Sequence, residues 1–285
     1  MRRVRRAVLA AALFPLVALL APVLATSKPW IIGKGGETIV RAPVPFDPDA
    51  VDLDARLSPP GLTHWLGTDE LGRDVFSRLI HGARVSVGAG LLASALALAL
   101  GALLGVAAGT GGPRLDRLVV SGIDVVQSLP PLVLVVAGAA FFDPSFFGAA
   151  LLIALTGWPE AARLVRAGAR RVRSAPFVEA ARASGASRAR VVFRHLLPHA
   201  LPPALATMPY VLGAAVLTEA SLSFLGLGTP PPTPSWGRAL ADARATLTEA
   251  WWCVLPPAAA LLLLILSARR LGDAVAGRPV ESRRS

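Results

Sequence analysis

The chain has 285 residues, 54% of them hydrophobic, with a formal net charge of +11 and a mean hydropathy of +0.58. This composition is too apolar for an ordinary soluble domain. The arginines would suggest nucleic-acid binding in a soluble protein, but here they lie between apolar runs and indicate membrane topology. The single cysteine, Cys253, excludes an internal disulfide and a cysteine-based metal cluster. The only lysines, Lys28 and Lys34, stand in no Gly-Lys-Ser/Thr motif, so we expect no ATP site and no cofactor in this chain.

The N-terminal region joins a basic cluster at residues 1–6 to an apolar run over 7–25. At about 19 residues, the run is long enough to cross a bilayer and longer than a usual signal-peptide core. A cleavable signal peptide is the alternative, because the sequence VLA ending at Ala25 could form a cleavage site. The length favours a retained transmembrane helix over residues 1–26.

Residues 27–84 are polar and rich in proline, which predicts an extracytoplasmic loop with little regular structure. A cluster of aspartates in this loop could suggest calcium binding. The spacing lacks the glycine and the closing glutamate of an EF-hand, so a solvated loop is the better interpretation. The cluster consists of Asp47, Asp49, Asp52 and Asp54.

The end of this loop predicts a short amphipathic helix over Asp69–His81 that lies along the membrane surface. Thr68 and the two acidic residues that follow it suit a helix N-terminus. Asp74 and Arg78 have the i, i+4 spacing of an ion pair on a helix surface.

Val85–Thr110 predicts the second spanning helix. Gly101, Gly105 and Gly109 repeat the G-x-x-x-G spacing that permits close contact between membrane helices. The alternative is that they are the ordinary glycine content of a membrane helix.

Leu118–Phe142 predicts the third span, which the pair Pro130-Pro131 should bend. Ionisable and polar groups inside a membrane usually face a bundle interior or a cavity. Asp124 and Gln127 are therefore candidates for the translocation path. A structural role is the alternative for Asp124, because Arg117 lies one heptad before it.

Three more spanning helices are predicted, over Phe146–Arg166, Leu201–Leu225 and Trp251–Ser267. In the fourth span, Glu160 and Arg163 have the i, i+3 spacing of an ion pair. In the fifth span, Glu219 lies about 18 residues, or about 27 Å, from the start of the helix. This places it near the far face of the membrane, as a third path candidate. Trp236, Trp251 and Trp252 fit an interfacial aromatic belt around an extracytoplasmic loop over 226–250.

Six spans place both termini on the same side of the membrane. The arginine-rich segments, namely residues 1–6, 114–117, 163–194 and the tail 273–285, then share that side. The positive-inside rule makes it the cytoplasm. The segment 174–198 is therefore predicted to be cytoplasmic.

This segment is polar, basic and helical in pattern, although apolar runs flank it. Pro176 suits a first helical position, and the small residues Ala180 and Ala181 follow Glu179. Gly185 should end the helix. The residues expected to contact a partner are Glu179, Ala180, Ala181, Gly185, Arg188, Leu197 and Pro198. The alternative is a linker whose arginines bind anionic lipid headgroups. His195 and His199 are interrupted by Pro198, so we do not expect a metal site there.

This segment resembles the cytoplasmic loop of binding-protein-dependent ABC importer permeases in three places: Glu-Ala-Ala at 179–181, Gly185, and Leu-Pro at 197–198. It departs from the family pattern at His195, where that pattern has isoleucine. The sequences HWLGTDELGRD at 64–74 and EASLSFLGLG at 219–228 resemble the dipeptide, oligopeptide and nickel branch of that family. The resemblance runs from about residue 64 to near the C-terminus. It also implies that the first hydrophobic segment is retained.

The resemblance implies an all-α inner-membrane protein of about six transmembrane helices, a type I ABC importer permease-like bundle with a cytoplasmic coupling helix. The core would span residues 85–272 and form half of a translocation path. Implied partners are a second related permease, two subunits that bind ATP and magnesium, an extracytoplasmic solute-binding protein and membrane lipid, with no nucleic acid. The solute would be a peptide, with nickel or another small solute as the alternative. A stand-alone secondary transporter would show inverted repeats or broken helices with midplane charges, and a structural subunit would not need the pattern at 179–198.

Overall fold

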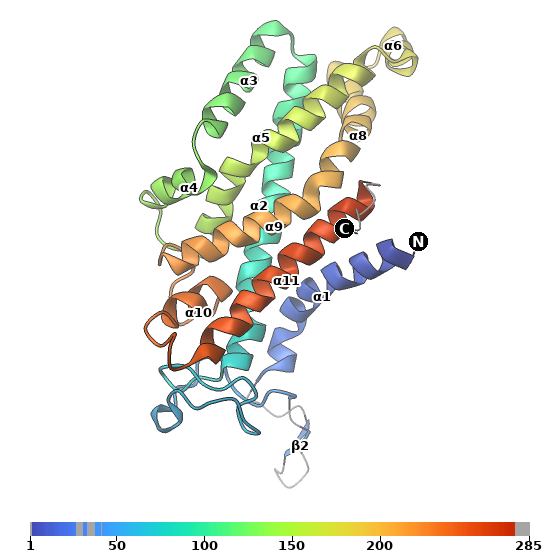
Figure 1. Cartoon of the computed structure of the whole chain (residues 1–285). Coiled ribbons are helices and arrows are strands. Elements are labelled where there is room, and N and C mark those ends of the chain that lie inside the picture. The colour runs from blue at the N-terminus through green and yellow to red at the C-terminus, as the bar shows by residue number, and fades with distance from the viewer. Residues whose placement is uncertain (1, 27–30, 33–37, 41, 277–285) are drawn as a thin grey trace, which may run out of the picture.

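The structure is a computed structural model that describes residues 2–26, 31–32, 38–40 and 42–276. The tail beyond Ala276 lies outside the described residues. The chain forms an elongated bundle of helices, with α6 at one end and the loop before α2 at the other, together with α10 (Figure 1). In chain order the elements are α1 (Arg2–Leu24), β1 (Ile31–Ile32), β2 (Thr38–Val40), η1 (Leu53–Ala55), α2 (Val75–Thr110), α3 (Pro113–Gln127), α4 (Pro131–Ala139), α5 (Phe146–Arg173), α6 (Pro176–Ala183), α7 (Arg188–Arg190), η2 (Val191–Leu196), α8 (Leu197–Ala200), α9 (Pro202–Phe224), α10 (Trp236–Asp242) and α11 (Trp251–Val275).

Within the described residues, three helices are long and apolar enough to cross a membrane, namely α2, α9 and α11, and the bent pair α3 and α4 makes a fourth candidate. The helices α1 and α5 complete the bundle but do not meet this measure. The apolar part of α1 that the structure describes, Ala11–Leu24, is shorter. The second half of α5 carries a charged series that ends in Arg170, Arg171 and Arg173.

The prediction of a close helix contact at the G-x-x-x-G series is confirmed, and α5 is the partner of α2. A Cβ atom on Gly101 would lie 2.6 Å from the Trp158 carbonyl oxygen, and one on Gly105 would lie 2.6 Å from that of Ala162. One on Gly109 would lie 2.8 Å from the Ala169 Cβ. The absence of side chains is what lets the two backbones meet.

The predicted amphipathic helix over Asp69–His81 is wrong, because α2 begins at Val75 and continues without a break to Thr110. The Asp74 side chain caps it by accepting a hydrogen bond of 2.7 Å from the Ser77 backbone amide. The predicted surface pair of Asp74 and Arg78 is also wrong. Arg78 is only 6% exposed, and its guanidinium lies 3.3 Å from Asp49.

The loop after α9 contains the helix α10, which the proline-rich sequence did not predict. Two of the tryptophans predicted for an interfacial belt do not face outward, because Trp236 and Trp252 are 3% and 8% exposed. Each indole N–H is satisfied by a backbone carbonyl: that of Trp236 donates to Leu79 (2.9 Å), and that of Trp252 donates to Thr68 (3.1 Å). Trp251 alone of these three is exposed, at 58%.

The predicted third span is two helices that meet at an angle of 87°. The break falls at residues 128–130, because Pro130 and Pro131 cannot donate the backbone hydrogen bonds that would continue α3. Pro131 then opens α4, where the missing N–H has no helical partner to lose.

Candidate functional site

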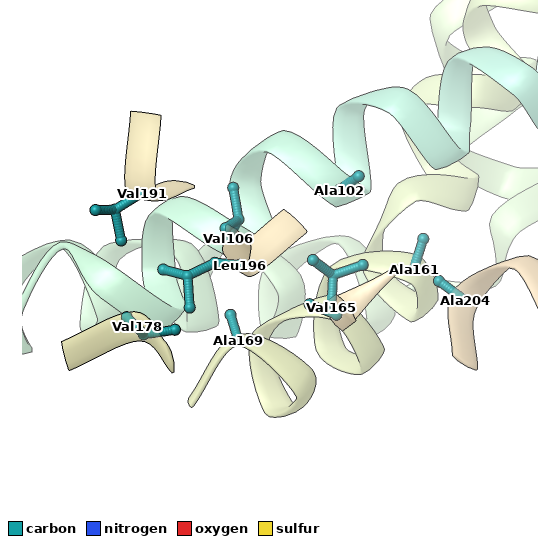
Figure 2. Close-up of a cluster of buried hydrophobic side chains, with 10 residues drawn as sticks. Ala102, Val106, Ala161, Val165, Ala169, Val178, Val191, Leu196 and Ala204 are labelled. Atoms are coloured by element: carbon teal, nitrogen blue, oxygen red, sulfur yellow. The ribbon is translucent and has the colours of Figure 1, made fainter. Parts of the chain in front are cut away.

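The segment from α6 to α8 is fastened to the bundle by an apolar cluster. Val178 of α6 is fully buried, and Val191 and Leu196 of η2 are 3% and 1% exposed. They pack with Val106 of α2, Val165 of α5 and further small residues of both helices (Figure 2). The segment is thus held firmly against the two helices that pack most closely in the bundle.

A left-handed residue ends α6. Gly185 has φ +79°, and its amide donates to the Arg182 carbonyl at 3.0 Å, while the Ala186 amide donates to the Ala181 carbonyl at 3.1 Å. This is the hydrogen-bond pattern of a Schellman motif. A Cβ on Gly185 would meet no other described residue within 4 Å, so the glycine is required here for its backbone conformation.

The helical path resumes at once after this turn. The Ser187 hydroxyl accepts a hydrogen bond of 3.3 Å from the Arg190 amide, as an N-cap. One π-helical turn, η2, then precedes Pro198, and the Leu197 amide donates to the Val192 carbonyl, five residues back. Proline lacks the N–H of a regular helical bond, and the wider turn accommodates that loss.

The face opposite the apolar cluster is exposed. Glu179, Ala180, Gly185, Arg188 and Pro198 are exposed, while the remaining predicted contact residues, Ala181 and Leu197, are partly buried. The structure therefore brings all seven predicted residues onto one continuous segment.

Two exposed aromatic residues of this segment were missing from the predicted site. Phe177 is 43% exposed and Phe193 is 58% exposed. The ring of Phe177 lies 5.0 Å from that of His199. Large aromatic residues in an otherwise polar stretch were the available signal, because an exposed phenylalanine is a common anchor at protein interfaces.

A groove of about 670 Å³ lies at mid-height in the bundle. The middle parts of α2, α5 and α9 form its walls, and the break between α3 and α4 lies beside it. Non-helical backbone at membrane depth is tolerated where it lines a hydrated cavity. The lining of the groove includes Ser94, Gln127, Leu129, Thr156, Glu160, Tyr210 and Thr218.

The three predicted path residues have different surroundings. Gln127 lines the groove. Asp124 is not part of the lining. Its carboxylate lies 3.4 Å from the guanidinium of Arg163. This ion pair takes the place of two predicted ones, Asp124 with Arg117 and Glu160 with Arg163. Glu219 is 1% exposed, away from the groove, and its Oε1 accepts a hydrogen bond of 2.7 Å from the Ser223 hydroxyl.

The motif at 64–74 builds a cap over the start of α2. Gly72 has φ +70°, and a Cβ there would lie 1.6 Å from the Asp52 carbonyl oxygen, so only glycine fits. The carbonyl of Thr68 accepts the indole hydrogen bond of Trp252, which ties the cap to α11. This motif therefore has a structural role in the chain.

The comparisons with known proteins agree on one family. The family described as "Binding-protein-dependent transport system inner membrane component" matches residues 98–280. The probable D,D-dipeptide transport system permease protein DdpC of Escherichia coli K12 is 43% identical over 211 residues, 74% of this chain and 71% of its own length. A putative peptide transport system permease protein of Brucella suis is 39% identical over 263 residues, 91% of this chain and 82% of its own length.

A solved structure supports the fold. A chain of the MetNI methionine ABC transporter in an inward-facing conformation has a TM-score of 0.58 at 20% identity, covering 71% of this chain and 96% of its own. The bundle with an exposed helical segment at one end is therefore the fold of a type I ABC importer permease. This chain belongs to the inner-membrane permease components of binding-protein-dependent transport systems.

Proposed function

We propose that this chain is a permease subunit of an ATP-driven importer of short peptides, and that it forms half of the translocation path beside a second, related permease. The similar proteins from Escherichia coli and Brucella suis are described as dipeptide and peptide transport permeases, and the groove at mid-height supports a path along α2, α5 and α9. The observation that carries the proposal is the segment from α6 to α8, which is anchored on one face and exposed on the other.

The orientation follows from the distribution of arginine. The end of the bundle that carries α6 includes Arg170, Arg171, Arg173, Arg182 and Arg188, whereas the opposite loops are mixed or acidic. We place the α6 end and both termini in the cytoplasm on the positive-inside rule. Two ATP-binding subunits, which would supply ATP and magnesium, then meet α6, and a solute-binding protein meets the opposite end.

In this mechanism α6 seats its small exposed face in a groove on an ATP-binding subunit. Closure of the two ATP-binding subunits displaces α6. The apolar cluster around Val178 and Leu196 passes this displacement to α2 and α5. The groove at mid-height then alternates in its access to the two sides of the membrane.

A bulky residue on the exposed face of α6 tests the proposal. Ala180→Tyr adds a large side chain on the exposed face of the helix, where this chain has room for it. We expect the variant to enter the membrane normally, to lose at least about tenfold in co-purification of the ATP-binding subunits, and to lose ATP-driven peptide uptake. Ala50→Tyr is the matched control, because Ala50 is also exposed but lies in the loop at the opposite end. It should retain the ATP-binding subunits.

Two results would contradict the proposal. Normal co-purification and uptake with Ala180→Tyr would leave α6 as a lipid-binding linker. Uptake by the purified chain without ATP-binding subunits would identify a secondary transporter.

A further inference from the structure

The charge on the groove is concentrated in one residue. Among the described residues that line it, Glu160 is the only one with a formal charge at neutral pH, so no arginine or lysine of the lining neutralises it. The groove volume of about 670 Å³ is within the range of small-ligand sites. A single carboxylate in such a space sets its electrostatic potential, because charges interact more strongly in a partly dehydrated groove than in bulk water.

The three arginines nearest to Glu160 along α5 are paired elsewhere. Arg163 pairs with Asp124, and both Arg166 and Arg170 pair with Asp116 of α3, at 2.9 Å for the Arg166 Nη2 and 2.6 Å for the Arg170 Nη2. The Glu160 side chain is exposed and makes no ion pair or hydrogen bond with any residue in the described part of the chain. Its carboxylate is thus open to a ligand in the groove.

The hydroxyl groups that line the same groove are oriented so as to accept hydrogen bonds. The hydroxyl protons of Ser94 and Thr218 point at carbonyls of their own helices, Gly90 at 2.7 Å and Ala214 at 2.9 Å. The Thr156 hydroxyl donates in the same way to Ile153 at 3.0 Å. The oxygen lone pairs of these side chains remain as acceptors. Apart from the Gln127 amide, which can also donate, these polar groups of the lining suit a ligand rich in hydrogen-bond donors.

We propose that Glu160 binds the ammonium group of a peptide as it passes through the groove, and that it favours peptides with additional positive charge over anionic ones. An ammonium group has three donors and no acceptor, which matches a groove that holds one carboxylate and several acceptor hydroxyl oxygens. This inference rests on the proposed function, because it names the substrate feature that the groove selects. The solute-binding protein would select peptides first, and the groove would add a second selection.

A thiol reporter measures the potential of the groove without any transport. Thr218→Cys in a Cys253→Ala background would be modified by a cationic and by an anionic methanethiosulfonate in the purified complex. The ratio of the cationic rate to the anionic rate should fall at least about fivefold with Glu160→Gln. It should be retained with Glu160→Asp and with Glu249→Gln, a control that removes an exposed carboxylate outside the groove lining. An unchanged ratio in Glu160→Gln would overturn the inference.

Uptake then tests the substrate. Proteoliposomes with the complete transporter would be given two peptides that differ only in lysine or glutamate at one position, each loaded equally on the binding protein. Glu160→Gln should lower the uptake of the lysine peptide relative to the glutamate peptide by at least about threefold. An equal loss for both peptides would make Glu160 structural and refute its role in selection. Failure of the unmodified complex to take up either peptide would refute the proposed function instead, and the thiol ratio would still decide the charge of the groove.

Discussion

Substitutions at Gly185 can distinguish two roles of this residue: the left-handed backbone conformation that ends α6, and a contact with a partner subunit. With φ +79° and nothing within 4 Å of the place that a Cβ would take, the cost of a side chain in this chain is set by the backbone alone. A non-glycine residue in the left-handed region costs about 1–2 kcal/mol, and a β-branched one costs more. Asparagine and aspartate tolerate this conformation. Because about 1.4 kcal/mol is a factor of ten in an equilibrium, Gly185→Val should shift the equilibrium between the native end of α6 and its other conformations at least about tenfold toward the others.

Three variants give three distinct expectations. Gly185→Val should reduce peptide-stimulated ATP hydrolysis by more than twofold and by up to about tenfold, whereas Gly185→Asn should stay within about twofold of the unsubstituted protein. Gly185→Asp has the same backbone tolerance as asparagine but adds a charge, so a loss with aspartate alone would report a packed contact with the ATP-binding subunit. All three should enter the membrane, because the spanning helices are unchanged. Equal loss with valine and asparagine would refute the backbone explanation, and full activity of the valine variant would refute the need for the Schellman motif.

The other predictions concern the bundle and its orientation. Gly105→Ala should destabilise the purified protein by about 1–3 kcal/mol, since its Cβ would lie 2.6 Å from the Ala162 carbonyl oxygen, whereas Gly122→Ala, with its nearest contact at 3.8 Å, should change the thermal midpoint little. Ser223→Ala removes the hydroxyl that donates a 2.7 Å hydrogen bond to the buried Glu219 carboxylate and should cost about 1–3 kcal/mol in a denaturation assay; an unchanged midpoint would show that another donor, such as the Ser86 hydroxyl, takes its place. Cysteines at Asp52 and Thr233, in a Cys253-free background, should react with an impermeant reagent in intact cells, and protection of both would reverse the proposed orientation.

Sequence alone could predict the bundle because its signals are long and repetitive. Apolar runs near bilayer length, the glycine series at 101–109 and the proline pair at 130–131 each have one dominant physical consequence. The segment at 179–198 was recognisable because Gly185 and Pro198 disrupt regular helices in specific ways. The predictions that failed depended on long-range contacts: Trp252 is buried because a carbonyl of the distant residue Thr68 accepts its N–H.

The charge of the groove also depends on a long-range contact that the sequence does not reveal. Glu160 and Arg163 have the spacing of an ion pair, yet Asp124 on another helix takes the arginine. Spacing along one helix cannot reveal such competition, because the competitor is brought close only by tertiary packing. The carboxylate left over is what gives the groove its charge.

The short links on either side of the α6–α8 segment have a mechanical consequence. Only residues 174 and 175 separate α5 from α6, and only Leu201 separates α8 from α9. A displacement of α6 is therefore transmitted directly to α5 and α9, which form two walls of the groove. The cluster at Val191 and Leu196 holds α2 to the same rigid body. We expect the chain to rock as a unit and its own groove to keep its shape, so that the gate opens and closes along the seam with the neighbouring permease.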